Sequence, residues 1–246
     1  MTEQKRSTER FGDRAVAYAA YRPSYPDEAI DAVFDGLGDP SSLVVADIGS
    51  GTGISSRMFA ERGAHVIGVE PNAEMRTHAR VPENVEFVEG TGEATGLPTG
   101  SVDIAVACQA FHWFATPAAM REFRRIARLR ACLLQYERDE SNAFTKAYGD
   151  CVRAHATDDT EQVRMRALAV FSNFPEARVT RHAFTASQEL DLDGVIGRAA
   201  SSSYLANTGP EAVALRRDLR KIFEQNEQAG RVELAMVCFV VTADWE

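Results

Sequence analysis

The sequence predicts an α/β fold in which a mostly parallel sheet is covered by helices on both faces. Five short apolar runs between residues 43 and 136 alternate with helical stretches, and this alternation is typical of parallel strands joined by helical crossovers. Of the 246 residues, 45% are hydrophobic, enough for one large core without disulfides or a structural metal. No internal repeat or long linker divides the chain, so a single domain is expected.

The first helix is expected after Pro26, where apolar residues recur at helical spacing over residues 27–37. Gly36 and Gly38 end this stretch. The five strand-like runs are residues 43–48, 65–70, 85–88, 102–107 and 132–136. Further helices are expected at residues 54–62, 73–79 and 117–129.

After residue 136 the pattern changes to longer helices. They are predicted at residues 141–156, 160–171, 191–201 and 210–228. A strand-like run covers residues 178–184, and residues 232–242 are β-branched and apolar. We expect the closing segment to return to the sheet as its last strand, and the additional helices to form a cap on the same domain.

The charge balance argues against nucleic acid and membrane partners, because 27 basic and 36 acidic residues give a net charge of -9. Four widely spaced cysteines without a C-x-x-C pair favour the cytoplasm. The polar residues 1–10 lead to no apolar signal segment, so neither export nor membrane anchoring is expected. The histidines show no metal-ligand spacing, and no metal is expected.

A glycine-rich turn follows the first predicted strand, with the sequence Asp47-Ile48-Gly49-Ser50-Gly51-Thr52-Gly53. Such a turn between a strand and a helix lets backbone N–H groups approach a ligand closely. The dinucleotide fingerprint would need Gly or Ala at position 56, where Ser56 stands. A nicotinamide-dependent oxidoreductase is therefore the weaker alternative.

The pattern D-x-G-x-G-x-G resembles the cofactor motif of class I S-adenosylmethionine-dependent methyltransferases. Glu70 ends the second strand, where these enzymes place the acid that binds both ribose hydroxyls. A carboxylate offers two acceptor oxygens to such a diol. The resemblance implies S-adenosylmethionine as the cofactor. It places Asp47, Gly49, Ser50, Gly51, Gly53, Glu70 and Pro71 in the binding site.

Two later segments extend the resemblance. Residues 89–94 look like the adenine-contacting loop of the family, with Gly92 and Glu93 expected at the cofactor. Residues 108–114 follow the fourth strand, from which family members line the methyl-transfer pocket, and Gln109 is expected there.

Residues 18–26 resemble the N-terminal Y-x-x-x-R-P-x-Y-P lid of the branch that includes trans-aconitate methyltransferases. Tyr18 and Arg22 are expected at the cofactor, Tyr18 stacking over it or packing the lid on the sheet. Arg22 is a candidate clamp for the carboxylate of the cofactor or for an anionic substrate. We expect residues 11–25 to order over bound cofactor as a lid.

The resemblance implies a Rossmann-like seven-stranded, mostly parallel sheet with an antiparallel last strand, helices on both faces and a helical cap. The expected parts of this single methyltransferase domain are an arm and lid at residues 1–25, a cofactor-binding core at 43–137, a cap at 138–230 and a closing strand at 231–246.

Two positions depart from the family pattern. Relatives usually enter the fifth strand through Pro-Gly-Gly, whereas this chain has Leu129-Arg130-Ala131, so that turn must be built differently. Gly92 stands where relatives often carry Ala or an acid, which leaves the adenine contacts open.

Methyl transfer requires alignment of a nucleophile and exclusion of water, and no metal. His112 is a candidate general base for a hydroxyl acceptor, whereas a carboxylate acceptor needs none. The net charge favours a small-molecule substrate over nucleic acid. The expected nucleophile is an oxygen atom of a carboxylate or a hydroxyl. The chain is expected to be a monomer or homodimer, and a non-catalytic regulatory protein that binds S-adenosylmethionine is the alternative.

Overall fold

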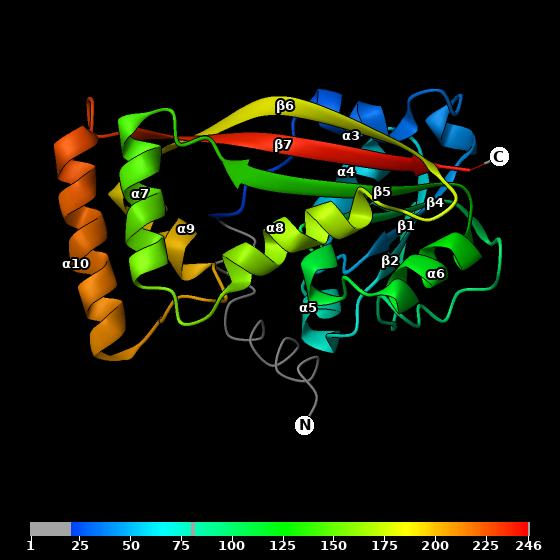
Figure 1. Ribbon diagram of the computed structural model, residues 1–246, viewed down its shortest axis with the longest axis horizontal. Helices are drawn as coiled ribbons and strands as arrows, with labels where there is room; N and C mark the ends of the chain where they lie inside the picture. Colours follow the sequence, from blue (N-terminus) through cyan, green and yellow to red (C-terminus); the bar gives the residue numbers. More distant parts are fainter. Residues whose placement is uncertain (1–20, 80–81, 246) are drawn as a thin grey trace.

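The computed structural model describes residues 21–79 and 82–245, whose seven strands form one sheet in the order β3-β2-β1-β4-β5-β7-β6 (Figure 1). The strands are β1 (Val44–Ile48), β2 (His65–Val69), β3 (Val85–Val88), β4 (Val102–Cys108), β5 (Ala127–Arg138), β6 (Arg178–Leu190) and β7 (Val232–Asp244). Neighbouring strands from β3 to β5 are parallel, and β7 runs antiparallel to both β5 and β6. The predicted mostly parallel sheet with an antiparallel last strand is confirmed.

Helices cover both faces of the sheet, as the apolar strands require. On one face α3 (Asp27–Phe34) and α4 (Ile54–Glu61) share a core with the strands, and on the other α6 (Pro117–Ile126) and α8 (Thr160–Phe171) do so. The short α5 (Ala73–Thr77) follows β2. None of the helices in the described part of the chain is long and apolar enough to cross a membrane.

Three helices form a cap at one end of the sheet (Figure 1). They are α7 (Ala143–Ala154), α9 (Leu192–Ala200) and α10 (Gly209–Asn226). Their buried side chains form a third apolar cluster, which also contains Val232 and Leu234 from the start of β7. The cap therefore lies where β5 ends. Within the expected cap region of residues 138–230, α8 packs on the sheet and β6 belongs to it, so the cap itself consists of α7, α9 and α10.

The entry into β5 differs from the prediction of a helix over residues 117–129. The helix α6 ends at Ile126, and β5 begins at Ala127, which pairs with Val102. The strand β5 follows α6 directly, without the glycine turn that relatives were expected to have. Ala127 is buried, and the pairing register between β4 and β5 shifts between Val102 and Ile104. Arg130 is also buried, and its guanidinium donates a hydrogen bond of 2.9 Å to the carbonyl of Val33.

The loop after β3 is fixed to α6 by one carboxylate. Oε1 of Glu122 accepts hydrogen bonds from the backbone N and the hydroxyl of Thr95, at 2.9 and 2.6 Å, and both Glu122 oxygens accept 2.7 Å bonds from Arg125. The ion pair with Arg125 lowers the pKa of Glu122 to about 2. This contact holds the predicted adenine loop against the domain.

We predict that Glu122→Gln lowers the free energy of unfolding by about 1–3 kcal/mol near neutral pH, because a buried charge-assisted network loses its anion. The wild-type carboxyl titrates at about 2 rather than 4.5, so its contribution is present above about pH 4.5 and is lost as the pH falls toward 2. Urea denaturation should show the difference between the two proteins shrinking below about pH 5. An equal difference near pH 7 and near pH 3 would contradict this role.

Candidate functional site

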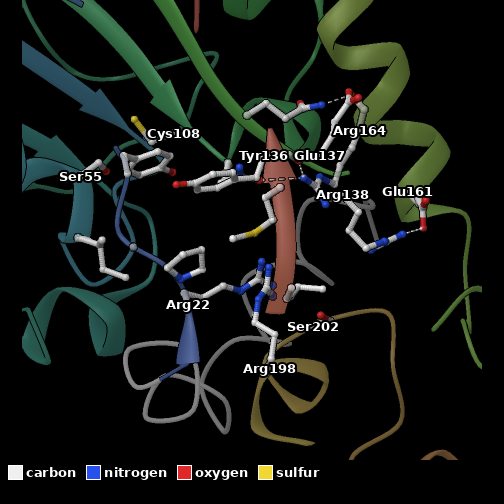
Figure 2. A pocket seen from close by; sticks show the side chains of 18 of the residues that line it. Arg22, Ser55, Cys108, Tyr136, Glu137, Arg138, Glu161, Arg164, Arg198 and Ser202 are labelled. Atoms are coloured by element: carbon white, nitrogen blue, oxygen red, sulfur yellow. Dashed lines mark hydrogen bonds and ion pairs between the residues drawn. The ribbon is translucent and has the colours of Figure 1, made fainter. Parts of the chain in front are cut away.

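Two adjoining cavities open between the carboxyl ends of the parallel strands and the cap, the usual ligand position in such sheets. The glutamate cavity, lined by Glu70, has about 1140 Å³ of empty space, and the arginine cavity, lined by Arg138 and Arg198, has about 1210 Å³. Figure 2 shows the arginine cavity. The residues lining both are Arg22, Gly49, Gly51, Cys108, Gln109, Arg164 and Tyr204.

The glycine-rich turn between β1 and α4 forms part of the wall of both cavities. Gly49 and Gly51 have positive φ angles of 74° and 58°, which favour glycine. A Cβ on Gly51 would meet no atom within 4 Å, so this backbone borders open space. The buried hydroxyls of Ser50 and Thr52, beside the arginine cavity, have no hydrogen-bond partner within the described ranges. The turn therefore offers close backbone approach and two hydroxyls to a ligand.

Glu70 follows β2 and is 8% exposed in the glutamate cavity. Its Oε2 accepts a 3.0 Å hydrogen bond from the N–H of Gly51, and Oε1 accepts a 2.9 Å bond from the N–H of Asn72. A carboxylate has about four acceptor positions, so each oxygen can still accept from a hydroxyl. Burial raises the pKa of Glu70 above its ordinary value. Pro71 lines the same cavity.

Asp47 lies behind the glycine turn and lines neither cavity. It is fully buried, and its Oδ2 accepts hydrogen bonds of 2.7 and 2.6 Å from the hydroxyls of Ser55 and Ser56. Asp47 thus ties β1 to the first turn of α4, where Gly53 is the N-terminal cap residue. The predicted cofactor residues Asp47, Gly53 and Glu93 are not among the residues lining either cavity.

Gly92 lines the glutamate cavity next to the ring of Phe114. A Cβ at this position would lie 2.3 Å from the ring of Phe114. The ring of Phe114 occupies the space that a side chain would take, and Phe114 itself lines the cavity.

Gln109 and His112 follow β4 at the boundary of the site. Gln109 has a φ of 57°, which is uncommon outside glycine, and its Oε1 accepts a 3.0 Å hydrogen bond from Arg164. His112 stands in the short 3-10 helix Phe111–Trp113 and lines the glutamate cavity. Burial, and then the charges of Arg164 and Arg22, lower the pKa of His112 well below 6.5. The imidazole is therefore neutral near neutral pH.

The start of the described chain is anchored over the cavities. Arg22 lines both and donates a 3.2 Å hydrogen bond to the carbonyl of Ser201. Tyr25 stacks on Tyr136, with ring centroids 5.4 Å apart, and the Tyr136 hydroxyl donates a 2.7 Å bond to the carbonyl of Ser24. Tyr18 and residues 11–20 of the predicted lid lie outside the described residues, so closure of the lid stays a prediction.

Several charged and aromatic residues of the arginine cavity were not predicted as site residues from the sequence. Among them are Arg138, Tyr148, Arg164 and Arg198, and Tyr204 was considered only as part of a serine-rich stretch that could contact a substrate. They come from β5, α7, α8, α9 and the segment after α9. The only local signal is an arginine within an apolar helix, as at Arg198 between Val195 and Ala199. Their convergence depends on how the cap docks.

Comparisons with known proteins agree with this geometry. The family model described as "Methyltransferase domain" matches residues 46–133. An uncharacterised methyltransferase of Mycobacterium tuberculosis is 33% identical over 198 residues, which is 79% of this chain and 76% of the relative. An uncharacterised methyltransferase-like protein of Schizosaccharomyces pombe is 33% identical over 118 residues, covering 47% and 46% of the two chains.

Solved structures share the fold at low sequence identity. A structure described as a type II methyltransferase from Anaeromyxobacter dehalogenans has a TM-score of 0.67 and 21% identity, covering 92% of this chain and 98% of its own. The YcgJ protein from Bacillus subtilis has a TM-score of 0.58 and 18% identity, covering 90% and 99%.

We predict that Gly92→Ala destabilises the protein by about 1–3 kcal/mol, because the added methyl group overlaps the Phe114 ring. Chemical denaturation of both proteins measures this. The double variant Gly92→Ala/Phe114→Leu, compared with Phe114→Leu, should show a smaller effect of the methyl group. An equal loss in both backgrounds would mean that the ring is not the obstacle.

Proposed function

The chain belongs to the class I S-adenosylmethionine-dependent methyltransferases, and we propose that it methylates a small-molecule acceptor through an oxygen nucleophile, a carboxylate or a hydroxyl. The observation that carries the proposal is the arginine cavity, which adjoins the predicted cofactor site and is bordered by the cap. Family membership argues against a nicotinamide-dependent oxidoreductase.

The residues present fit S-adenosylmethionine, the cofactor of this family. Glu70 keeps acceptor capacity for a ribose diol, and Gly51 allows close approach of a ligand to the backbone. The buried hydroxyls of Ser50 and Thr52 have no partner in the described chain, as expected of groups that meet a polar ligand. When bound, the cofactor supplies a methyl group activated by a sulfonium.

A small acceptor is supported by the shape and charge of the chain. The arginine cavity is a partly open cleft lined by residues of β5, α7, α8 and α9, so the acceptor would lie between the sheet and the cap. Such a cleft limits the access of water, and methyl transfer needs water to be excluded. The net charge of -9 opposes binding to nucleic acid.

The acceptor decides whether a proton must move. The oxygen forms a bond to the methyl carbon as the carbon–sulfur bond breaks, and the electron pair stays on sulfur. A carboxylate becomes a methyl ester without losing a proton, whereas a hydroxyl releases one. His112 is unprotonated near neutral pH because its pKa is lowered, so its ring can accept that proton.

We further infer that the protein works in the cytoplasm as a monomer or homodimer. All four cysteines are buried free thiols, which suits a reducing compartment. The division into an arm and lid at residues 1–25, a core at 43–137, a cap region and a closing strand is part of the same proposal.

The proposed function is tested by incubating the purified chain with methyl-labelled S-adenosylmethionine and a panel of small acids, alcohols, phenols and amines. We expect labelled methyl esters or methyl ethers. Label in tRNA or protein from a cell extract, with no labelled small product, would contradict the proposal.

We predict that Glu70→Ala weakens binding of S-adenosylhomocysteine by about 1.5–3 kcal/mol, because hydrogen bonds to a charged carboxylate are lost. Isothermal titration calorimetry measures the Kd. The control is Glu86→Ala, which removes an exposed carboxylate from β3, outside both cavities. An unchanged Kd in Glu70→Ala would move the ribose site elsewhere.

We predict that His112→Ala lowers kcat by about 10²-fold for a hydroxyl acceptor and leaves the Kd for S-adenosylhomocysteine within about twofold, because only proton transfer is lost. For a carboxylate acceptor, kcat should hardly change. A hydroxyl acceptor with unchanged kcat in the variant would show that His112 is not the base.

A further inference from the structure

Four arginines line the arginine cavity of a chain whose net charge is -9. Arg22 comes from the N-terminal segment, Arg138 from β5, Arg164 from α8 and Arg198 from α9. Figure 2 shows Arg22 and Arg198 close together and Arg138 directed to Glu161. Bringing like charges together in a partly buried space is unfavourable unless anions compensate them.

Only part of this charge is compensated within the protein. Arg138 pairs with Glu161 at 2.6 Å and lies 3.6 Å from Glu140. Within residues 21–79 and 82–245, no carboxylate forms an ion pair with Arg164 or Arg198. Three carboxylates, Glu137, Glu140 and Glu161, line the cavity beside the four arginines, so one positive charge is in excess.

The hydrogen bonds of these two guanidiniums are also incomplete. Arg164 donates to the carbonyl of Tyr136 and to Oε1 of Gln109, but its Nε is buried without a partner in the described chain. No hydrogen bond from the Arg198 side chain reaches any described residue, and its Nε is likewise buried. Buried N–H groups of this kind normally meet an acceptor.

Two tyrosines face the same charges. Tyr148 and Tyr204 are 3% and 7% exposed and line the cavity. Burial raises the pKa of the Tyr204 phenol, but the surrounding arginine charges bring it below its ordinary value overall. At Tyr148, by contrast, burial outweighs the arginine charges and raises the pKa of the phenol. The arginine charges therefore act most strongly at Tyr204.

We propose that Arg198 and Arg164 bind an oxyanion of the methyl acceptor, so that the substrate is a small organic anion with a carboxylate or phosphate group. This rests on the proposed function, since it assumes that the acceptor occupies the arginine cavity. A guanidinium matches either oxyanion with two parallel N–H donors.

The bound oxyanion serves recognition and is not the methylated group. Two guanidiniums hold its lone pairs and lower its nucleophilicity. The nucleophilic oxygen is then a second group of the same molecule, placed at the boundary of the two cavities. A hydroxy acid, a dicarboxylate or a hydroxyalkyl phosphate has this arrangement.

The test uses the purified full chain saturated with S-adenosylhomocysteine. Calorimetry follows binding of malate, glycerol 3-phosphate and their neutral counterparts, malamide and glycerol. We expect at least one of the two anions to bind, whereas malamide and glycerol do not bind. The anion that binds shows whether the site takes a carboxylate or a phosphate. Arg198→Gln should weaken that binding about 10- to 100-fold, as expected for loss of charge-assisted hydrogen bonds.

The matched control is Arg166→Gln, which makes the same charge change on α8 at an exposed side chain that does not line the cavity. It should leave anion binding unchanged, and in both variants the Kd for S-adenosylhomocysteine should stay within about twofold. The proposal is overturned if the neutral compounds bind as well as the anions, if neither anion binds, or if Arg198→Gln and Arg166→Gln weaken binding equally.

Failure of this proposal is distinguishable from failure of the proposed function. Anion binding that depends on Arg198, with label transferred only to a macromolecule, contradicts the small-molecule function and leaves Arg198 in an anion site that does not hold the acceptor. Methylation of neutral small molecules only, without anion binding, keeps the function and refutes the oxyanion site.

Discussion

The buried carboxylate of Glu70 holds together the backbone segments that border the glutamate cavity. It accepts the N–H of Gly51 from the turn after β1 and the N–H of Asn72 from the start of α5. The turn after β1 is therefore held to the end of β2 by a group that also faces the cavity. Asp47 fixes the other end of the same turn, because its carboxylate accepts hydrogen bonds from Ser55 and Ser56 at the start of α4. Two acids thus fix one short backbone segment, and only Glu70 remains available to a ligand.

The second organising feature is the length of the strands near the cap. β5, β6 and β7 extend over 12 or 13 residues each, whereas β1 and β2 have 5. The extended strands β6 and β7 provide the surface on which α7 and α9 dock, and α10 packs on these two helices. In this arrangement Arg138, Arg164 and Arg198 line one cavity. The glutamate cavity lies mainly at the ends of the parallel strands, and the arginine cavity is bordered by the cap.

Sequence reasoning predicted the sheet well, because strands follow local apolar patterns. The roles of the predicted cofactor residues stay predictions. Alternating apolar runs identified all seven strands, and the spacing of the glycines and Glu70 identified the cavity edge. The start of β5 was wrong, since the periodicity of α6 continues through Leu129 while pairing with β4 already begins at Ala127. Arg164 and Arg198 were missed because they are distant in sequence and meet only through the packing of the cap.

A crystal structure of the chain with S-adenosylhomocysteine would show where each part of the ligand lies. We expect the two ribose hydroxyls within hydrogen-bond distance of Glu70, the nucleoside in the glutamate cavity and the sulfur directed toward the arginine cavity. A nucleoside bound elsewhere, or a sulfur directed away from the arginines, would contradict this expectation.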